Sequence, residues 1–428
     1  MANSAPRFLL TTPGTIHIVG AGLAGLSAAV RLASSGRRVT LHELARHGGG
    51  RCRSYFEPAL RLTIDNGNHL ILSGNVAAVS FLKTIGSEHK LVGPPQSVFA
   101  FADLATGERW QLRLNDGRLP WWVLSKARRV PSTRAFEYLA LSGLLLAGPN
   151  QTVAEVIDCK SPLYQRLWRP ILLAALNAEP LEASARLASA VVRQSLARGG
   201  AACRPLIASA GLGAAFVDPA LAYLRRHGAD LLFAHHLRRL ELAEGRVRAL
   251  DFGEDMVELG DKDLVILAVP SWVAQALVPQ LLAPQQFRAI LNAHFAIAPP
   301  PELPTMLGIL NGTAEWLFSF ADRLSVTISA ADRFSEAPRE EIARSIWREV
   351  ATLTGLGAQM PPWQIIKERR ATFAALPAEH SRRPGPRTPW RNLLLAGDWT
   401  ATGLPATIES AVRSGNRAAD MAAALQSC

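Results

Sequence analysis

The sequence of 428 residues is poor in cysteine and contains no long apolar run. Its four cysteines are widely spaced and form no C-x-x-C pair, which excludes a disulfide scaffold and the usual cysteine metal sites. No apolar run approaches the roughly 18–20 residues that span a bilayer, and residues 1–12 lack the apolar core of a secretory signal. We therefore expect a cytoplasmic protein without a bound metal, either free or attached peripherally to the inner face of the cytoplasmic membrane.

Acidic residues and lysine are also scarce. The chain has 35 acidic and 46 basic residues, a net charge of +11, and only six of the basic residues are lysines. This surplus favours an anionic partner surface. The arginines are scattered, with no zinc-ligand spacing and no RNA-binding signature, so we expect an anionic membrane and no nucleic acid. The alternative is that a GC-rich genome encodes arginine in place of lysine, which leaves the charge without a partner.

A glycine-rich turn near the start of the chain is the first positive signal. Residues 16–19 form an apolar strand that runs into Gly20-x-Gly22-x-x-Gly25. The first glycine permits a sharp turn, the second lets the backbone approach a pyrophosphate, and the third lets the next helix pack on the sheet. Leu23 and Ala24 of this turn are further candidates for binding, and the N-terminus of the expected helix, residues 26–34, presents free N–H groups to an anion. The turn therefore predicts a bound dinucleotide.

Two further segments extend this prediction. The expected second strand, residues 38–43, ends in Glu43, 23 residues after Gly20, where a ribose hydroxyl needs an acceptor. Consecutive glycines then end at Gly50 and precede Arg51, so backbone donors and a guanidinium would face phosphate oxygens. A surface ion pair is the alternative for Arg51. Both segments favour a phosphate-bearing ligand.

A polar turn interrupts the apolar residues that follow. Gly67, Asn68 and His69 belong to the sequence Asp-Asn-Gly-Asn-His at 65–69. Such a density of polar groups is typical of a tight loop or of a ligand contact. For His69 the alternative is a histidine that caps the turn.

The order of expected strands and helices predicts an α/β fold, in which a Rossmann-type nucleotide-binding domain contains an inserted α+β substrate domain. Residues 230–240 and 246–252 are expected to form a hairpin-like pair, and residues 263–270 a buried strand. The expected division is 14–75, 205–275 and 385–428 for the nucleotide-binding domain, 76–204 for the helical part of the substrate domain, and 276–384 for its sheet part.

The helical part of the substrate domain contains two notable patches. Trp121 and Trp122 lie beside cations and short apolar helices, a mixture typical of an interfacial membrane contact or the mouth of a lipid tunnel. A buried helical core with a snorkelling rim is the alternative. In the second patch, Asn177 and Glu179 end an apolar helix, where they either face a ligand or cap the helix.

Near the C-terminus an apolar strand ends at Gly397 and Asp398, and a glycine-rich approach leads into a last helix. With the first glycine turn, this suggests a bound flavin dinucleotide. The chain resembles the flavin amine oxidase and carotenoid desaturase superfamily over essentially its whole length. The resemblance is carried by four motifs in one order, at 20–25 with Glu43, 49–51, 263–270 and 396–398 followed by 405–415.

The resemblance implies that FAD lies extended through the nucleotide-binding domain. Glu43 would hold the adenosine ribose, Arg51 would touch the pyrophosphate, and the backbone of Leu237 would meet the adenine. The turn at 67–69 would run beside the isoalloxazine, and Asp398 would bind near the ribityl group and the pyrophosphate. The last helix, beginning near Thr407 and Ile408, would direct its positive end at the flavin O2 and stabilise the reduced anion. The arginine that the family often has two residues after its acidic residue is Ala45 in this chain.

The same resemblance narrows the substrate class. Amine oxidases frame the amine with aromatic side chains, but Thr407 stands where they have a tyrosine. The chain looks closer to isoprenoid-acting members, and its stretches 51–55, 64–70, 168–177 and 397–400 are most similar to the hydroxysqualene dehydroxylases. We therefore expect a long apolar isoprenoid substrate.

The implied reaction is reductive. Hydroxysqualene, an allylic alcohol, loses its hydroxyl and receives hydride from reduced FAD, which gives squalene, and an unidentified donor re-reduces the flavin. An acid must protonate the departing hydroxyl. His69 is the first candidate because its turn lies beside the flavin by resemblance, and Glu179 is the second. Two alternatives remain open, an FAD-dependent isoprenoid desaturase and a prenyl-lipid escort protein without redox activity.

Overall fold

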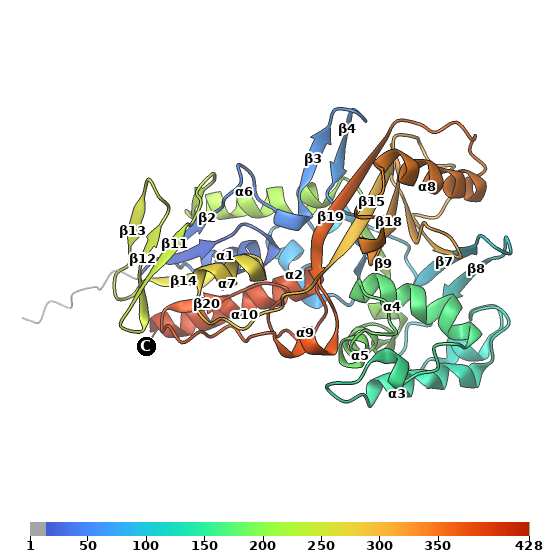
Figure 1. The fold of residues 1–428 in the computed structure, drawn as a ribbon, viewed down its shortest axis with the longest axis horizontal. Coiled ribbons are helices and arrows are strands. Elements are labelled where there is room, and N and C mark those ends of the chain that lie inside the picture. The colour runs from blue at the N-terminus through green and yellow to red at the C-terminus, as the bar shows by residue number, and fades with distance from the viewer. Residues whose placement is uncertain (1–13, 428) are drawn as a thin grey trace, which may run out of the picture.

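The computed structural model describes residues 14–427, so the predicted absence of a signal in residues 1–12 lies outside the described part. A five-stranded parallel sheet occupies the left half of Figure 1. Its strands lie in the order β10 (Asp230–Leu232), β2 (Val39–His42), β1 (Ile16–Val19), β14 (Leu264–Leu267) and β20 (Leu393–Leu395). All but β10 are fully buried, as expected for short strands in a sheet covered on both faces.

Helices cover one face of this sheet. The helices α1 (Leu23–Ser34) and α10 (Ile408–Ser427), from opposite ends of the chain, pack directly on each other, and α6 (Asp218–Arg226) lies beside α1. Gly415 permits the close approach, because a Cβ there would lie only 2.1 Å from the carbonyl oxygen of Ala24. The packing of α10 on α1 therefore brings the C-terminal motif to the first glycine turn.

The opposite face carries a small antiparallel sheet of β11 (Arg239–Ala243), β12 (Arg246–Asp251) and β13 (Met256–Glu258). The expected pairing of 230–240 with 246–252 is therefore partly wrong. Residues 230–232 join the parallel sheet, and the hairpin begins only at Arg239. The chain leaves the parallel sheet at Ala234, whose φ of 54° breaks the extended conformation. The short helix α7 (Ser271–Leu277) follows β14.

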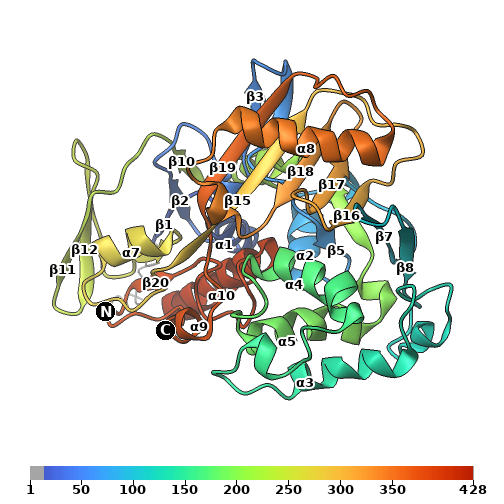
Figure 2. The ribbon, with the colours of Figure 1, turned by 45° about the vertical axis from the view of Figure 1, so that its right-hand side comes forward.

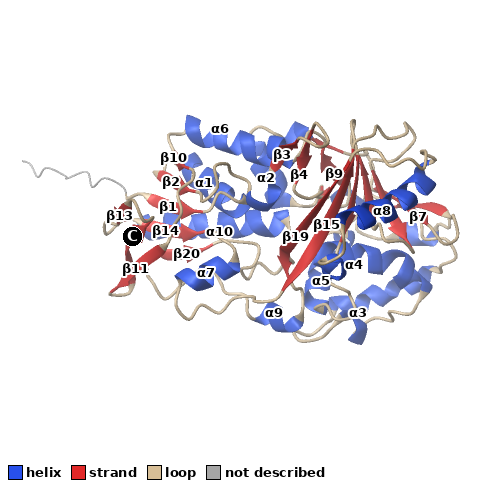
Figure 3. Ribbon diagram, turned by 45° about the horizontal axis from the view of Figure 1, so that its top comes forward, coloured by secondary structure: helices blue, strands red, loops and turns tan. Residues whose placement is uncertain are grey.

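A twisted seven-stranded sheet forms the centre of the other half of the molecule (Figure 3). Its order is β19 (Trp363–Phe373), β15 (Phe287–Phe295), β18 (Leu324–Ile328), β17 (Trp316–Ser319), β16 (Met306–Leu310), β7 (Val98–Asp103) and β8 (Arg109–Arg113). All neighbours are antiparallel except β16 and β7. One face packs on α8 (Arg339–Thr354) through an aliphatic core centred on Trp347.

The other face of this sheet packs against the helical segment, which is seen below the sheet in Figure 2. Its helices are α3 (Leu141–Leu145), α4 (Arg169–Leu176) and α5 (Ala185–Gln194), joined by short helical turns. The expected helical part, residues 76–204, is helical from Trp121 to Gln194, but its first third also contributes the strands β6 (Leu91–Val92), β7 and β8. The remaining elements connect the two halves. They are α2 (Val76–Thr84), α9 (Pro377–Ser381), the β3 (Ser54–Glu57) and β4 (Leu62–Asp65) hairpin, and a small sheet of β5 (Ile71–Leu72), β9 (Pro205–Ala208) and β6 (Leu91–Val92).

Candidate flavin site

The first glycine turn has the geometry of a phosphate cradle. Gly20 has a φ of 106°, and a Cβ on Gly25 would lie 1.8 Å from the Gly20 carbonyl oxygen, so neither position tolerates a side chain. Gly22 differs, because a Cβ there would meet nothing within 4 Å. No side chain caps the N-terminus of α1, which leaves the N–H groups of Leu23 and Ala24 free for an anion. The open side of Gly22 is therefore where a pyrophosphate fits.

The second glycine loop lies against the first. The amide of Gly49 donates to the Ala21 carbonyl at 2.8 Å, and Gly50, with a φ of 54°, lies close to the Cα of Gly22. The Glu43 carboxylate accepts the amide hydrogens of Ala21 and Ala45 at 2.7 and 2.8 Å. The three motifs thus form one continuous polar surface at the carboxyl ends of β1 and β2.

Leu237 belongs to the segment that crosses beside Glu43. The amide of His235 donates to the Glu43 carbonyl at 2.9 Å, and Leu237 is buried two residues further on. The structure therefore brings the expected ribose and adenine contacts to the same end of the site. This arrangement suits an extended dinucleotide with its adenosine beyond β2.

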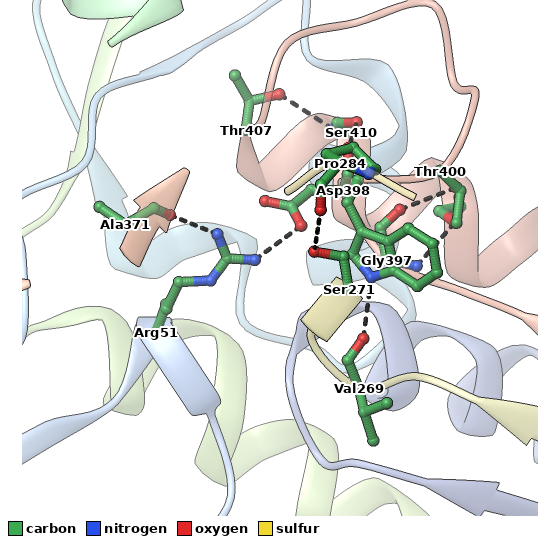
Figure 4. Close-up of polar contacts among 12 residues, drawn as sticks. Arg51, Val269, Ser271, Pro284, Ala371, Gly397, Asp398, Thr400, Thr407 and Ser410 are labelled. Carbon is green, nitrogen blue, oxygen red and sulfur yellow. Dashed lines mark hydrogen bonds and ion pairs between the residues drawn. The ribbon is translucent and has the colours of Figure 1, made fainter. Parts of the chain in front are cut away.

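The far end of the site is built around Arg51 and Asp398, which form an ion pair of 2.7 Å (Figure 4). Arg51 also donates to the Ala371 carbonyl on β19, so it links the two halves of the molecule. Asp398 is almost fully buried, whereas the Arg51 side chain is 41% exposed. Gly397 is required beside them, because a Cβ there would lie 2.4 Å from the Trp399 ring.

The last helix begins directly behind Asp398. Thr407 is its N-cap residue, since its hydroxyl accepts the Ser410 amide hydrogen at 3.1 Å. The Ser410 hydroxyl donates to the Asp398 carbonyl at 3.3 Å, which ties the first turn of α10 to the aspartate loop (Figure 4). Ile408 is the first residue of the helix. The positive end of the α10 dipole therefore lies at the same place as Asp398.

An arginine that the sequence did not single out holds this loop. Arg383 is buried, and its guanidinium donates to the carbonyl oxygens of Trp399, Asp398, Leu404 and Thr400 and to the Thr402 hydroxyl. Burial lowers the pKa of Arg383 to about 10, although the charge of Asp398 raises it, so the group stays charged at neutral pH. Nothing in the local sequence, a proline-rich connection, indicates this role.

The polar turn at 65–69 is fixed by the seven-stranded sheet. Asn292 on β15 accepts the Asn68 amide hydrogen at 3.3 Å and donates to the Asn66 carbonyl at 3.4 Å. Thr327 on β18 donates to Asn292 at 2.8 Å and accepts from the Asn68 side chain at 3.1 Å. A Cβ on Gly67 would lie 3.2 Å from the Asn292 amide nitrogen. Sequence reasoning missed both Asn292 and Thr327.

One buried acceptor in this turn has no partner. The side-chain oxygen of Asn68 is enclosed, yet it makes no hydrogen bond to any part of the chain between residues 14 and 427. A buried polar atom without a partner is costly, so such atoms often mark a ligand site. Together with the open side of Gly22 and the uncapped α1, it shows that the residues present fit FAD.

The two candidate acids have different surroundings. His69 is half-buried, and burial together with the charge of Arg51 lowers its pKa to about 4, which leaves the imidazole neutral at pH 7. Glu179 follows α4 and forms a partly exposed ion pair of 2.8 Å with Arg169. Asn177 caps α4 with a φ of 49° and accepts the Ala330 amide hydrogen at 2.7 Å, so it has a structural role.

A third carboxyl group escaped sequence reasoning. Glu315 precedes β17, and its side chain is 15% exposed. Burial raises its pKa to about 7, opposed by the amide hydrogen of Ser329 and the charge of Arg333. Because Ser329 directly follows the neighbouring strand β18, no local pattern predicts this environment.

A narrow cleft beside the Arg51–Asp398 pair is lined by aromatic rings, including Trp272, Phe287 and Phe373. Arg370 covers its rim with the guanidinium 4.9 Å from the Trp272 ring. The cleft leaves a space of only about 10 Å³, so it forms a wall of aromatic rings beside Asp398 and not a substrate cavity. No group of three or more potential metal ligands occurs within residues 14–427, and no described helix could cross a membrane.

The fold and this site define a flavin oxidoreductase of the Rossmann type. Residues 23–422 match the family of flavin containing amine oxidoreductases, and the chain belongs to this family. The predicted fold class is confirmed, and FAD is the cofactor that the site is built to hold.

The chain is also similar to individual named proteins over almost its whole length. The chain is 55% identical to a hydroxysqualene dehydroxylase of Rhodopseudomonas palustris, over 95% of this chain and 98% of that protein. It is 53% identical to a hydroxysqualene dehydroxylase of Sinorhizobium fredii, over 96% and 98%. It is 24% identical to a probable zeta-carotene desaturase of Synechococcus elongatus, over 94% and 97%.

Solved structures support the fold. An oxidoreductase from Methanosarcina mazei aligns with a TM-score of 0.74 at 15% identity, over 95% of this chain and 100% of that one. Cyclohexylamine oxidase from Brevibacterium oxydans aligns with a TM-score of 0.66 at 20% identity, over 96% and 99%. These likenesses concern the fold alone.

Proposed function

We propose that this protein is an FAD-dependent hydroxysqualene dehydroxylase, which converts hydroxysqualene to squalene. The observation that carries the proposal is the 55% identity over 98% of a relative of that name. The desaturase alternative has weaker support, because the desaturase relative is only 24% identical. The escort alternative has no specific support, and the Arg51–Asp398 ion pair together with the Glu43 carboxylate supports the binding of a flavin.

Different residues of the chain would bind different parts of FAD. The N-terminus of α1, with Gly20, Gly22 and Gly25, and the Gly50–Arg51 loop would hold the pyrophosphate. Glu43 and Leu237 would hold the adenosine, and Asp398 the ribityl region. Thr407 and Ile408 would place the positive end of α10 at the flavin ring. When bound and reduced, FAD supplies the hydride that replaces the hydroxyl group of the substrate.

The reaction also requires that the hydroxyl group of the substrate leave as water. Ionisation of the allylic C–O bond leaves a delocalised carbocation on the substrate, and protonation of the leaving oxygen releases water. The aromatic cleft beside Asp398 would exclude bulk water from that cation. We propose His69 as the acid that gives this proton to the leaving oxygen, with Glu179 as the second candidate; because the pKa of His69 is lowered to about 4, its protonated fraction, and with it turnover, should rise as the pH falls. Comparison of H69A with E179Q would decide which of the two lowers turnover.

The decisive test of the proposal is product analysis. Purified protein with FAD and a chemical reductant should convert hydroxysqualene to squalene under anaerobic conditions, as followed by mass spectrometry. A G25A variant, which cannot form the glycine turn, is the negative control. Formation of a desaturated isoprenoid without squalene would favour the alternative. The electron donor that reduces FAD in the cell is unidentified.

The origin of the strands in the two large sheets supports a division of the chain into an FAD-binding domain and a substrate domain. Strands of the parallel sheet come from residues 16–42, 230–267 and 393–395, and the seven-stranded sheet comes from 98–113 and 287–373. We propose that 14–75, 205–275 and 385–428 form the FAD-binding domain, and that 76–204 and 276–384 form the substrate domain. Limited proteolysis with and without FAD would test these boundaries, because FAD should protect only the first set.

Peripheral attachment to an anionic membrane is proposed for the edge of the helical segment. The two tryptophans separate in the structure, since Trp122 is buried against Tyr138 whereas Trp121 is 52% exposed. Leu119 and Leu124 are exposed on the same segment. We call Leu119, Trp121 and Leu124 the apolar rim. Exposed apolar side chains among cations favour a lipid headgroup layer, and the reduced cysteines favour a cytoplasmic location on the inner membrane face.

Co-sedimentation with vesicles would test this attachment. The double variant W121S/L124S should lose binding to vesicles that contain phosphatidylglycerol. F56S is the matched control, because Phe56 is exposed to a similar degree on the distant β3–β4 hairpin. Equal binding by all three proteins would refute the attachment.

A further inference from the structure

A polar cavity lies between the end of β8 and residues 125–128, which follow the apolar rim in the chain. Its volume is about 170 Å³, many times the space that one water molecule needs. The backbone holds it open, because the Arg113 amide donates to the Arg128 carbonyl at 3.0 Å and the Leu114 amide to the Ser97 carbonyl at 3.0 Å. The lining residues are Gln96, Ser97, Val98, Arg113, Leu114, Ser125, Ala127 and Arg128.

The charge of this cavity is uncompensated. Arg113 donates through Nε and one Nη to the Gln111 side chain, and its other Nη has no partner among the described residues 14–427. The Arg128 guanidinium lies 4.7 Å from the centre of the Trp121 ring, and it forms no hydrogen bond or ion pair with any residue from 14 to 427. No lining residue is a carboxylate. Two arginines that share a polar cavity without an acid favour an anionic oxygen ligand.

The apolar rim indicates which kind of anion the cavity binds. Trp121 connects the two features, since one face of its ring meets Arg128 while more than half of the side chain is open to solvent. Leu119 and Leu124 flank it, exposed by 80% and 71%. A ligand that fills the cavity therefore continues outward over an apolar surface. Phosphate esters of lipids have this construction, whereas a free phosphate ion has no part that would contact the rim.

We propose that the cavity between Arg113 and Arg128 binds the phosphate of an anionic phospholipid headgroup while the apolar rim enters the membrane interface. This site rests on the membrane attachment proposed above, and it gives that attachment a specific headgroup contact. It also fixes the orientation of the helical segment on the bilayer, with β8 next to the headgroup layer.

The test compares two double variants that remove the same charge from the same face. R113Q/R128Q empties the cavity of its cations, whereas R118Q/K126Q removes two exposed cations that do not line it. Each protein, loaded with FAD, is titrated with phosphatidylcholine vesicles that contain or lack phosphatidylglycerol. We expect R113Q/R128Q to weaken binding to the anionic vesicles about tenfold more than R118Q/K126Q does, because only the former removes charge-assisted hydrogen bonds to phosphate.

Each outcome has one meaning. Equal losses in the two variants would overturn the cavity site while the attachment of the wild type stands. A wild type that does not distinguish the two vesicle types would overturn both proposals. Saturable binding of inorganic phosphate that R113Q/R128Q abolishes, without a change in vesicle binding, would identify a free-anion site and overturn the lipid headgroup. Melting temperatures and FAD content should be the same in all three proteins.

Discussion

Replacement of Arg383 by methionine should destabilise the loop that carries Asp398. The guanidinium donates hydrogen bonds to four carbonyl oxygens and one hydroxyl of residues 398–404, and four of these bonds are 2.7–3.3 Å long. It also lies 4.7 Å from the Phe373 ring. A hydrogen bond from a charged donor contributes about 1.5–3 kcal/mol, but such contributions are not additive and the desolvated charge itself is unfavourable. We therefore expect a net loss of about 3–5 kcal/mol for R383M. Methionine fills most of the volume, so the loss reports on hydrogen bonds more than on a cavity.

The assay is thermal unfolding of the FAD-free protein, followed by titration with FAD. For a chain of this size the loss corresponds to a decrease in melting temperature of about 3–6 °C. The affinity for FAD should also fall at least about tenfold, because the loop positions Asp398. R387M is the control, since Arg387 is exposed. A melting temperature within about 1 °C of this control, with unchanged FAD affinity, would refute the role given to Arg383.

Three other substitutions test separate parts of the site. G22A adds a methyl group where nothing lies within 4 Å, so the FAD-free protein should melt as the wild type does, while FAD affinity falls at least about 100-fold; retained affinity would contradict the pyrophosphate site. N292A removes the bonds that hold Asn66 and Asn68, so turnover should fall about 10- to 100-fold with a changed visible spectrum of the flavin, and an unchanged spectrum would argue against positioning. The pKa of Glu315 is raised in the folded protein, so its contribution to stability is lost as pH rises from about 4.5 to about 7, by at most about 3 kcal/mol. E315Q should flatten this part of the stability profile, and identical pH profiles would contradict the raised pKa.

The parts of the site that the sequence predicted are local in the chain. The Gly20–Gly25 turn, Glu43 and the Gly397–Asp398 step each join a buried strand to the next segment, so strand pattern and glycine spacing were enough to place them. The direction of the last helix toward the flavin was implied by the resemblance, whereas its packing on α1 was not predicted. The confirmed α/β class follows from the same alternation of buried strands and helices.

The missed residues depend on contacts between distant segments. Asn292 holds a turn that is 224 positions earlier in the sequence, and its strand reads as an ordinary half-polar one. Arg383 lies in a connection that composition alone marks as a loop, and it acts on a loop that begins 15 residues later. The environment of Glu315 is set by Ser329, which directly follows the neighbouring strand β18. In each case the role arises from the pairing of strands and loops, which no local pattern encodes.

A single turnover without oxygen would decide whether this flavin protein reduces its isoprenoid substrate. The FAD-loaded protein is reduced, freed of reductant and mixed with hydroxysqualene, while flavin absorbance and squalene are measured together. We expect the absorbance of oxidised flavin to return and one squalene to form per flavin. A flavin that stays reduced while hydroxysqualene remains unchanged would contradict this expectation.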